Sequence, residues 1–292
     1  MLVSIILLNY NTFNYTCQCI DSIVKHTSGI DYEIVVVDNA STKDNPDIFV
    51  ERYPFIMLVK SPENGGFAKG NNLGIAHAKG DIVLLLNNDT YLTENSIAKS
   101  LEYLGTKEKL LAVKLVYENG RYQSNARKFR SIRNELLDLV RPVLYLLPYR
   151  KRAKLMLNQY FKGDFDTDCD WVSGAYMMFP KSALERLPGK KLDERFFMYG
   201  EDQLWCYQFR EAGYKTGFLS STTVVHIANA SVEPAKQLQL LKLYISRELD
   251  IIAYRKGKGL YYFFFCLIFS FKEQMRYYIK VLAYNLFKYR IR

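Results

Sequence analysis

Short carboxylate and amide side chains follow three apolar runs in the first third of the chain. Asn9-Tyr10-Asn11 follows residues 3–8, Asp38-Asn39 follows residues 33–37, and Asn87-Asn88-Asp89 follows residues 81–86. Hard divalent cations prefer oxygen ligands and commonly keep one or two carboxylates plus substrate phosphates. Asp89, paired with a histidine from a distant part of the chain, would therefore suit a cation that bridges a diphosphate. The plain alternative is an ordinary surface turn.

A glycine-rich segment, residues 63–74, is a candidate phosphate site. Its glycines at 65, 66, 70 and 74 leave backbone amides uncovered at the expected start of a helix, and open amides at a helix N-terminus attract phosphate. The spacing is neither GxGxxG nor that of a P-loop, which disfavours a dinucleotide-binding fold and an NTPase. Residues 38–41 could equally form a turn and a helix cap, because Asp, Asn and Ser favour both.

These groups need a scaffold that brings the ends of several strands together. Residues 3–8, 33–38, 56–60 and 81–86 are apolar runs of strand length, and residues 15–25 and 67–79 have the pattern of helices. Runs that are apolar on both faces and alternate with helices predict an α/β fold with a mostly parallel central sheet flanked by helices. In such folds ligands bind beyond the carboxyl ends of the strands, which is where the polar groups lie.

The motifs, taken in order, resemble one family. Residues 3–12 (VSIILLNYNT), 33–42 (EIVVVDNAST) and 63–90 (ENGGFAKGNNLGIAHAKGDIVLLLNNDT) are similar to the N-terminal half of family-2 glycosyltransferases. These enzymes have the GT-A (nucleotide-diphospho-sugar transferase) fold, and the rhamnosyltransferase-like branch is the most similar. Residues 171–175 (WVSGA), 192–202 (LDERFFMYGED) and 225–231 (VHIANAS) follow in the order of that branch. The resemblance covers roughly residues 1–231, and several ordered motifs make it specific.

The resemblance implies roles for particular residues. Asp38 would contact the nucleobase, Tyr10 would line its pocket, and Asp89 with His226 would hold the cation. Asp202, beside Glu201, would be the general base that takes the proton of the acceptor hydroxyl. The implied donor-binding set is Asn9, Tyr10, Asn11, Asp38, Asn39, Asn64, Gly65, Gly66, Phe67, Asn71, Asn72, Asn88 and Asp89, and the acceptor side is Trp171 and Gly174.

Plain readings of the second half stay open, and the chain departs from the family pattern in places. Trp171 is equally well core packing, and residues 201–202 are equally well a helix N-terminus. Asn87 stands where the family's metal motif has its first Asp. Leu204 and Gln208 replace an acidic residue and an Arg that the family often carries. The chain therefore offers one carboxylate to the cation at this motif and keeps the base.

The activity implied by the resemblance is an inverting, metal-dependent sugar transfer. The donor would be a nucleoside diphosphate sugar, with dTDP-L-rhamnose favoured and a UDP-hexose as the alternative. Mg²⁺ or Mn²⁺ would neutralise the leaving diphosphate, and the acceptor would be a lipid-linked saccharide in cell-surface polysaccharide synthesis. A nucleotidyltransferase would need a Gly-rich loop bearing Arg and Lys after the first strand, which residues 9–12 are not. A non-catalytic, membrane-bound scaffold is the remaining alternative, and the joint presence of Asp89, Asp202 and His226 argues against it.

The net charge of +10 is concentrated in two segments. Residues 121–162 carry eleven Lys/Arg and two Asp/Glu, and residues 236–292 carry twelve and three, so the rest of the chain is net acidic. Proteins that bind nucleic acid spread their cations over the folded module itself, so we expect no nucleic-acid partner. Both segments are also aromatic, which predicts contact with a membrane surface through residues 256–292, with residues 130–155 as a second candidate.

The C-terminal segment has the clearer amphipathic pattern. A stripe at steps of three and four comprises Phe271, Met275, Tyr278, Leu282, Leu286 and Tyr289, with Lys272, Arg276 and Lys280 along one flank. We expect lipid to bury the stripe and the cations to lie at headgroup level. As a helix, residues 260–271 are about 18 Å long, too short for a hydrocarbon core of about 30 Å. A homodimer interface is the alternative use of the stripe.

These observations predict the organisation and location of the protein. We expect a GT-A domain over residues 1–235, with a nucleotide-binding half (1–100), a basic helical insertion (121–162) and an acceptor and catalytic half (163–235), followed by a helical membrane-association segment (236–292). Apolar residues between 136 and 147 repeat at helical spacing and predict one insertion helix there. The five cysteines lack paired spacing, which favours a reducing compartment. The predicted location is the cytoplasmic side of the cell membrane, with peripheral (monotopic) attachment.

Overall fold

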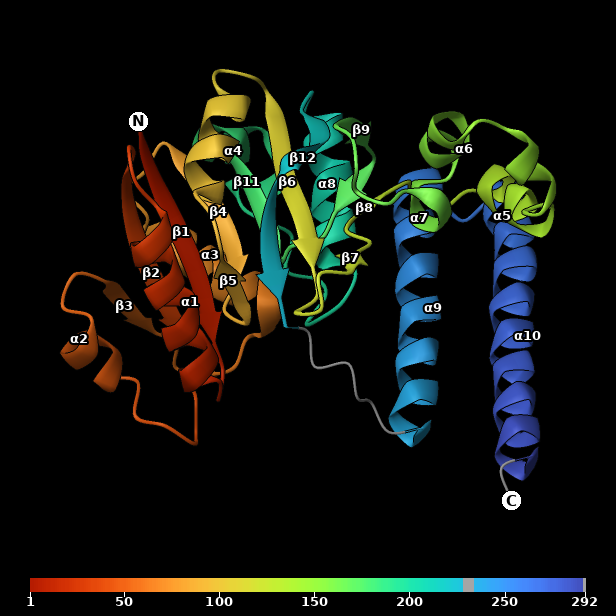
Figure 1. The fold of residues 1–292 in the computed structure, drawn as a ribbon, viewed down its shortest axis with the longest axis horizontal. Helices are drawn as coiled ribbons and strands as arrows, with labels where there is room; N and C mark the ends of the chain where they lie inside the picture. Colours follow the sequence, from red (N-terminus) through yellow and green to blue (C-terminus); the bar gives the residue numbers. More distant parts are fainter. Residues whose placement is uncertain (228–233, 291–292) are drawn as a thin grey trace. The chain divides into compact units, whose positions relative to one another are not determined.

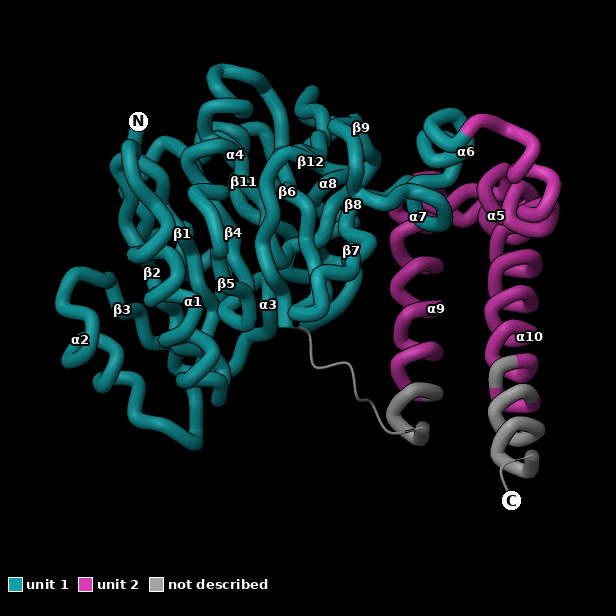
Figure 2. Tube along the Cα trace, in the orientation of Figure 1, with its two compact units in different colours: residues 1–129, 149–230 teal, residues 130–148, 231–292 magenta. Residues whose placement is uncertain are grey.

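The computed structural model describes residues 1–227 and 234–290, and its contacts divide the chain into two compact units, coloured separately in Figure 2. Unit 1 comprises Met1–Phe129 and Tyr149–Ala230, and unit 2 comprises Arg130–Pro148 and Ser231–Arg292. The middle of the predicted insertion thus groups with the C-terminal segment. The last residues of the 225–231 motif lie outside the described residues, whereas the named site residues all belong to unit 1.

Unit 1 alternates strands and helices along most of its length (Figure 1). Its elements are β1 (Leu2–Asn9), α1 (Phe13–His26), β2 (Asp31–Asp38), α2 (Ile48–Arg52), β3 (Met57–Lys60), α3 (Gly66–His77), β4 (Ile82–Asn87), β5 (Thr90–Leu92), α4 (Ser96–Leu104), β6 (Lys109–Val116), β7 (Tyr122–Gln123), β8 (Ala126–Arg127), α6 (Tyr149–Leu155), α7 (Leu157–Tyr160), β9 (Thr167–Cys169), β10 (Trp171–Val172), β11 (Tyr176–Pro180), η2 (Lys181–Arg186), η3 (Pro188–Lys190), α8 (Glu201–Glu211) and β12 (Lys215–His226). The strands and helices predicted for the first 90 residues are confirmed, with ends displaced by two residues or fewer.

The central sheet has the strand order β3-β2-β1-β4-β11-β6-β12-β5, with β7 paired to β6 and β9 paired to β12. β1 runs parallel to both β2 and β4, and β11 is antiparallel to β4. The four N-terminal strands are apolar on both faces because helices cover both sides of the sheet, as predicted. The α/β architecture is therefore a mostly parallel sheet whose carboxyl ends meet at one edge.

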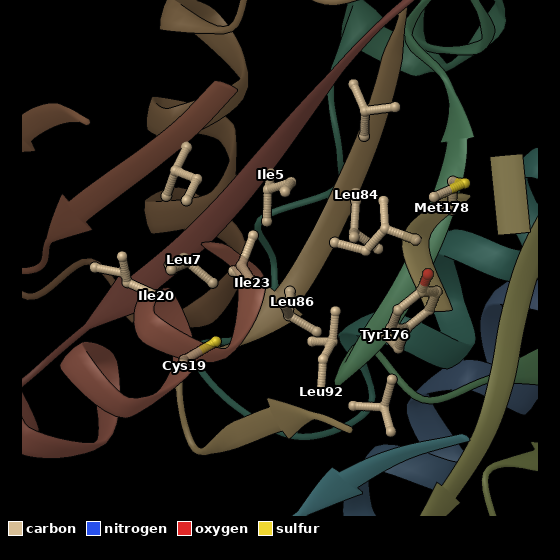
Figure 3. Packing of buried hydrophobic residues seen from close by; sticks show 14 of the residues in the cluster. Ile5, Leu7, Cys19, Ile20, Ile23, Leu84, Leu86, Leu92, Tyr176 and Met178 are labelled. Atoms are coloured by element: carbon tan, nitrogen blue, oxygen red, sulfur yellow. The ribbon is translucent and has the colours of Figure 1, made fainter. Parts of the chain in front are cut away.

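The core of unit 1 follows from the two-residue period of its strands. Alternate residues such as Ile5, Leu7 and Leu84 face α1, where they pack against Ile20 and Ile23 (Figure 3). The opposite face of β1 packs against α3. There glycine is required, because a Cβ at position 70 would lie 2.4 Å from Leu8 Cδ1 and one at position 74 would lie 2.5 Å from Ile6 Cγ2. The helix therefore lies directly on the strands and fixes the start of α3 beside the sheet edge.

Unit 2 consists of α5 (Ile132–Leu139), η1 (Val143–Leu146), α9 (Pro234–Lys256) and α10 (Leu260–Arg290). Ser131 caps α5 by accepting a hydrogen bond from the backbone N–H of Asn134. Ile252, Phe265 and Phe269 form its small apolar core. The predicted single helix across residues 136–147 is wrong: α5 ends at Leu139 and a 3₁₀ turn follows Pro142. Proline disfavours helical backbone at the residue before it, which explains the break.

The described helices include none that combines the length and the apolarity needed to cross a bilayer.

Candidate active site

The register of the parallel strands brings the predicted site residues to one edge of the sheet. Asn9 pairs with Asp38 across β1 and β2, and Leu8 pairs with Asn87 across β1 and β4. All three polar residues end their strands, so their side chains meet where a parallel sheet offers a binding crevice. The neighbourhood that the sequence predicted is therefore present.

Asp38 lies in a buried hydrogen-bond network. Asn9 Nδ2 donates to Asp38 Oδ1 over 2.8 Å, and the Ser41 backbone N–H donates to Asp38 Oδ2 over 3.0 Å. Thr16 Oγ1 donates to Asn9 Oδ1 over 2.9 Å, and Asn88 Nδ2 donates to Thr16 Oγ1 over 2.7 Å. Asp38 and Asn9 are buried, so the network first holds the strand ends together. Contact between Asp38 and a nucleobase stays a prediction.

The loop after β1 presents an exposed aromatic side chain. Tyr10 is 43% exposed, so a ligand can reach its ring. Asn11 has a left-handed φ of 57°, and its side-chain oxygen accepts hydrogen bonds from the backbone N–H groups of Thr42 and Lys43. Ala40, in the loop after β2, also has a positive φ of 60°. Left-handed non-glycine residues cluster at functional sites because the surrounding structure must hold them.

The expectation of open amides at the start of α3 is wrong. The Gly65 N–H donates to Asn39 Oδ1, the Gly66 N–H donates to Asn64 Oδ1 over 3.1 Å, and the Phe67 N–H donates to the Phe197 carbonyl over 2.9 Å. Protein acceptors, two of them from other parts of the chain and the third from the neighbouring Asn64, thus occupy these amides. Asn39 and Asn64 also bond each other over 2.8 Å. These bonds hold the segment in place, and its contact with a donor stays a prediction.

The next polar residues of α3 also bond to the protein. Asn71 Nδ2 donates to the Phe67 carbonyl over 2.9 Å. Asn72 donates to the Leu192 carbonyl and to Glu194 Oε1, each over 2.8 Å, and accepts from the Leu192 N–H. Asn72 therefore joins α3 to the segment that precedes α8. Donor binding by Asn71 and Asn72 stays a prediction.

Asp89 and His226 meet as predicted, although 137 residues separate them. β12 pairs with β5 in a register that sets His226 opposite Thr90, and the Ile227 N–H donates to the Asp89 carbonyl. His226 Nε2 lies 3.2 Å from Asp89 Oδ1 and 3.4 Å from Asn87 Nδ2. The two side chains are 15% and 28% exposed, so a ligand can reach them.

These two side chains fit a divalent cation. Adjacent ligands of an octahedral Mg²⁺, each at about 2.1 Å, lie about 3 Å apart, close to the observed 3.2 Å between Nε2 and Oδ1. The described residues contain no cluster of three or more His, Cys, Asp or Glu that could hold a metal. Asp89 and His226 would therefore be the imidazole and carboxylate ligands of a cation here, and oxygen atoms of other groups would complete its coordination.

Two backbone amides orient the Asp202 carboxylate. It lies in the first turn of α8, where its Oδ1 accepts from the Gln203 N–H over 2.7 Å and its Oδ2 accepts from the Gly174 N–H over 3.3 Å. Burial raises the pKa of Asp202, against these hydrogen bonds, which lower it. Ala175, next to Gly174, accepts a hydrogen bond from the Asn87 N–H, which ties the carboxylate to the end of β4.

Gly174 permits this arrangement through its size. A Cβ there would lie 3.0 Å from the Phe67 ring and 3.7 Å from Asp202 Cβ. Glu201, beside Asp202, is buried, so it is less accessible to a substrate than its neighbour. The helix N-terminus expected at residues 201–202 is confirmed.

Trp171 is mostly enclosed by protein. It is 8% exposed, its indole N–H donates to the Lys128 carbonyl, and the Arg127 guanidinium lies over its ring. These contacts favour core packing over a sugar platform, and its acceptor role stays a prediction. The sequence reasoning missed Tyr199, which is 52% exposed, has a φ of 67° and precedes Asp202 by three residues. It also missed Gln123, which contacts His226. Tyr199 belongs to the 192–202 motif, in which no role was predicted for it, and Gln123 belongs to none of the motifs.

The sheet topology, with polar residues gathered at the carboxyl ends of its strands, is that of the GT-A fold. The mannosyltransferase PcManGT from Pyrobaculum calidifontis, solved with GDP-Man and Mn²⁺, superposes with a TM-score of 0.59 at 18% identity over 93% of this chain and 68% of that one. Residues 1–349 of Staphylococcus aureus TarS, solved with UDP, superpose with a TM-score of 0.54 at 19% identity over 87% of this chain and 70% of that one. The family model for glycosyl transferase family 2 matches residues 4–185. The chain belongs to glycosyl transferase family 2.

Curated relatives match parts of the chain. The poly(ribitol-phosphate) beta-N-acetylglucosaminyltransferase TarS of Staphylococcus aureus is 24% identical over 260 residues, which is 86% of this chain and 44% of TarS. The glycosyltransferase GlyG of Streptococcus pneumoniae is 29% identical over 110 residues, 37% of this chain and 36% of GlyG. The chain therefore spans less than half the length of these relatives.

Proposed function

We propose that the chain transfers a sugar from a nucleoside diphosphate sugar to a lipid-linked saccharide, with inversion at the anomeric carbon, in cell-surface polysaccharide synthesis. The observation that carries this proposal is the Asp202 carboxylate, oriented by two backbone amides and tied through residues 174–175 to the strand that ends in the Asp89 motif. A carboxylate with a raised pKa is a stronger base than an ordinary Asp.

The chemistry follows from these positions. Asp202 accepts the proton of the acceptor hydroxyl while the oxygen of that hydroxyl bonds to the anomeric carbon. The bond between the anomeric carbon and the diphosphate oxygen breaks at the same time. Asp89 and His226 would hold Mg²⁺ or Mn²⁺, which neutralises charge on the leaving diphosphate. Asn87 Oδ1 is buried and finds no hydrogen-bond partner among the described residues. The scaffold alternative does not explain why these groups converge.

Two nucleotide sugars are proposed as candidate donors. The branch resemblance favours dTDP-L-rhamnose, whereas the solved complexes of TarS with UDP and with UDP-GlcNAc favour a UDP-hexose. A thermal-shift panel of dTDP, UDP and GDP sugars, with and without Mn²⁺, separates them, because a ligand at 100 times its Kd stabilises the folded protein by about 2.7 kcal/mol. Stabilisation by one base family that Mn²⁺ increases supports the proposal. The absence of any shift across the panel contradicts it.

The proposed location is the membrane surface, where a lipid-linked acceptor resides. Phe271, Met275, Tyr278 and Leu282 of α10 are each at least 45% exposed, as the predicted stripe requires. A peripheral position on the cytoplasmic side brings the crevice near its acceptor. A homodimer formed through the same stripe is the alternative.

A further inference from the structure

Unit 2 has an inverted distribution of polarity. On α5, Glu135 and Asp138 are buried, whereas Leu136, Leu139 and Val140 are 47–63% exposed. Soluble helices usually bury their apolar face and expose their charges. The reverse arrangement is expected where the surroundings are apolar and charges must pair inside the protein.

α10 repeats this inversion along its length. Its outward stripe includes Leu267 at 54% and Phe271 at 68% exposure, whereas Lys272 and Glu273 are each 8% exposed. At 100° per residue the exposed and the buried sets fall on opposite faces of the helix. The expectation that Lys272 lies at headgroup level is therefore wrong. The side chain of Arg276 is 32% exposed, so its place at headgroup level stays a prediction. The side chain of Lys280 lies outside the described residues.

The buried charges neutralise one another. The Lys272 ammonium bonds Glu135 and lies 2.8 Å from Asp138 Oδ2. The Arg276 guanidinium bonds Asp138 and lies 3.0 Å from Glu273 Oε1. The carboxylates come from α5 and α10, so the network joins these two helices.

Most of the described carboxylates of unit 2 are buried rather than exposed at its surface. Of the five carboxylate side chains in the described part of unit 2, those at 135, 138, 248 and 273 are buried, and Asp250 is exposed. Arg133, Lys242, Lys256 and Lys258 remain exposed. The outer surface is therefore apolar and cationic, which complements a lipid surface that carries anionic headgroups.

We propose that α5, η1 and the exposed face of α10 form one lipid-docking surface that embeds its apolar side chains among anionic lipids, with the Lys272 network as its dry interior. This inference rests on the proposed function only in taking the membrane as the place where the acceptor lies. It deepens that proposal by naming the two helices that enter the lipid and by assigning Lys272 to the interior.

The test is flotation of the full chain with vesicles of equal phosphatidylglycerol and phosphatidylcholine. The variant Leu139→Gln/Leu267→Gln/Phe271→Gln should bind at least about a hundredfold more weakly, since each exposed side chain withdrawn from lipid costs on the order of tenfold. The matched control is Ile48→Gln/Val50→Gln/Phe55→Gln, which changes three exposed apolar residues of unit 1 and should bind as wild type does.

Two outcomes overturn the docking surface. One is wild-type protein that does not bind these vesicles. The other is a dimer, found by light scattering without detergent, that the triple variant of unit 2 dissociates while vesicle binding is unchanged. Nucleotide binding is measured in the same proteins without lipid. If none of these proteins binds a nucleotide, the proposed function is contradicted, whereas the vesicle result still decides whether the docking surface exists.

A second, independent observation concerns the orientation of His226. Gln123 Nε2 lies 2.7 Å from the His226 carbonyl oxygen, and Gln123 Oε1 lies 2.8 Å from His226 Nδ1. A carbonyl oxygen only accepts, so the amide NH₂ must face it and Oε1 must face the ring. Because Oε1 also only accepts, Nδ1 of the neutral ring carries the proton and Nε2 is bare.

We infer that Gln123 is a positioning residue that fixes this tautomer and so presents Nε2 to a cation shared with Asp89. Nε2 and Asp89 Oδ1 are then two acceptors that lie 3.2 Å apart, an arrangement that a cation between them stabilises. Gln123 is 8% exposed and is positioned by β7, whose partner β6 also pairs with β12. Residues outside the coordination shell commonly fix metal-bound histidines in this way.

The test reads the tautomer of the metal-free protein by long-range proton–nitrogen NMR at pH about 8.5, where an ordinary imidazole is neutral. His226→Gln identifies the signal. Wild type should show the Nδ1–H form, and Gln123→Leu should convert it to the Nε2–H form, which bonds Asp89. Gln123→Glu keeps an acceptor for Nδ1 and should keep the tautomer.

Binding of Mn²⁺ alone, followed by electron paramagnetic resonance, should weaken at least about tenfold in Gln123→Leu. Gln208→Leu is the control, since its amide bonds Asp193. A Gln123→Leu protein with a lower melting temperature but wild-type tautomer and Mn²⁺ affinity would reduce Gln123 to a purely structural role and overturn the inference.

Discussion

Lys272→Met should destabilise unit 2 by about 2–3 kcal/mol, because it removes the buried cation that Glu135 and Asp138 share. Arg130 still bonds Glu135, and Arg141 and Arg276 still bond Asp138. The Lys272 side chain is 8% exposed, and those of its partners Glu135 and Asp138 are 1% and 3% exposed. Burial by itself would raise the pKa of Asp138, but hydrogen bonds from Lys272 and Arg141 outweigh it and lower the pKa from 3.8 to about 2. At 1.36 kcal/mol per unit this corresponds to about 2 kcal/mol from Asp138, and desolvation of Glu135 adds to it.

The pH dependence of this contribution has a definite sign. A carboxyl whose pKa is lower in the folded state stabilises the protein above its unfolded pKa of about 3.9, and the contribution disappears as the pH falls through about 2. The difference between wild type and Lys272→Met should therefore be large at pH 7 and should shrink below pH about 4.

Hydrogen exchange of the α10 amides, with urea unfolding followed by circular dichroism, measures the effect. Lys242→Met changes an exposed lysine of α9 and should stay within about 0.5 kcal/mol of wild type. Adding Glu135→Gln and Asp138→Asn to Lys272→Met should restore most of the loss, because neutral amides are cheaper to bury than charges. A Lys272→Met protein as stable as wild type would refute the reasoning.

Three further outcomes are expected for variants and conditions that affect unit 1. In thermal melts Gly66→Ala should destabilise the protein by about 1–3 kcal/mol more than Gly120→Ala does. Both glycines have a positive φ, but only at position 66 would the new Cβ clash, because it would lie 2.3 Å from the Phe197 carbonyl oxygen. Equal losses of stability would contradict the clash. The acid limb of kcat/KM should lie above pH about 4, because burial raises the pKa of Asp202; a rate unchanged down to pH 4 would contradict that environment. Tyr199→Ala should raise the KM for acceptor and leave donor binding unchanged, and an unchanged acceptor KM would remove Tyr199 from the site.

The N-terminal half was predictable from sequence because its signals are local. Four apolar runs and two amphipathic stretches encode the parallel sheet, and the polar residues that end the strands locate its crevice. The meeting of Asp89 with His226 was predicted from their motifs, and the structure confirms the contact at 3.2 Å. Their roles in binding metal stay predictions, as does the donor set.

The predictions that proved wrong concern residues whose surroundings are set by a distant segment of the chain. The amides at the start of α3 are occupied by Asn39, Asn64 and the Phe197 carbonyl, of which two come from other parts of the chain. Lys272 was expected at a membrane surface, but α5 brings two carboxylates to it from more than 130 residues away. A helical pattern gives the faces of a helix but does not say which face is buried.

The central claim is that Asp202 is the base of a sugar transfer, and single-turnover transfer with Asp202→Asn tests it most directly. Asparagine keeps the shape of the side chain but cannot take the proton, so transfer should fall by at least about 100-fold while donor binding persists. Transfer at the wild-type rate by Asp202→Asn would contradict the account.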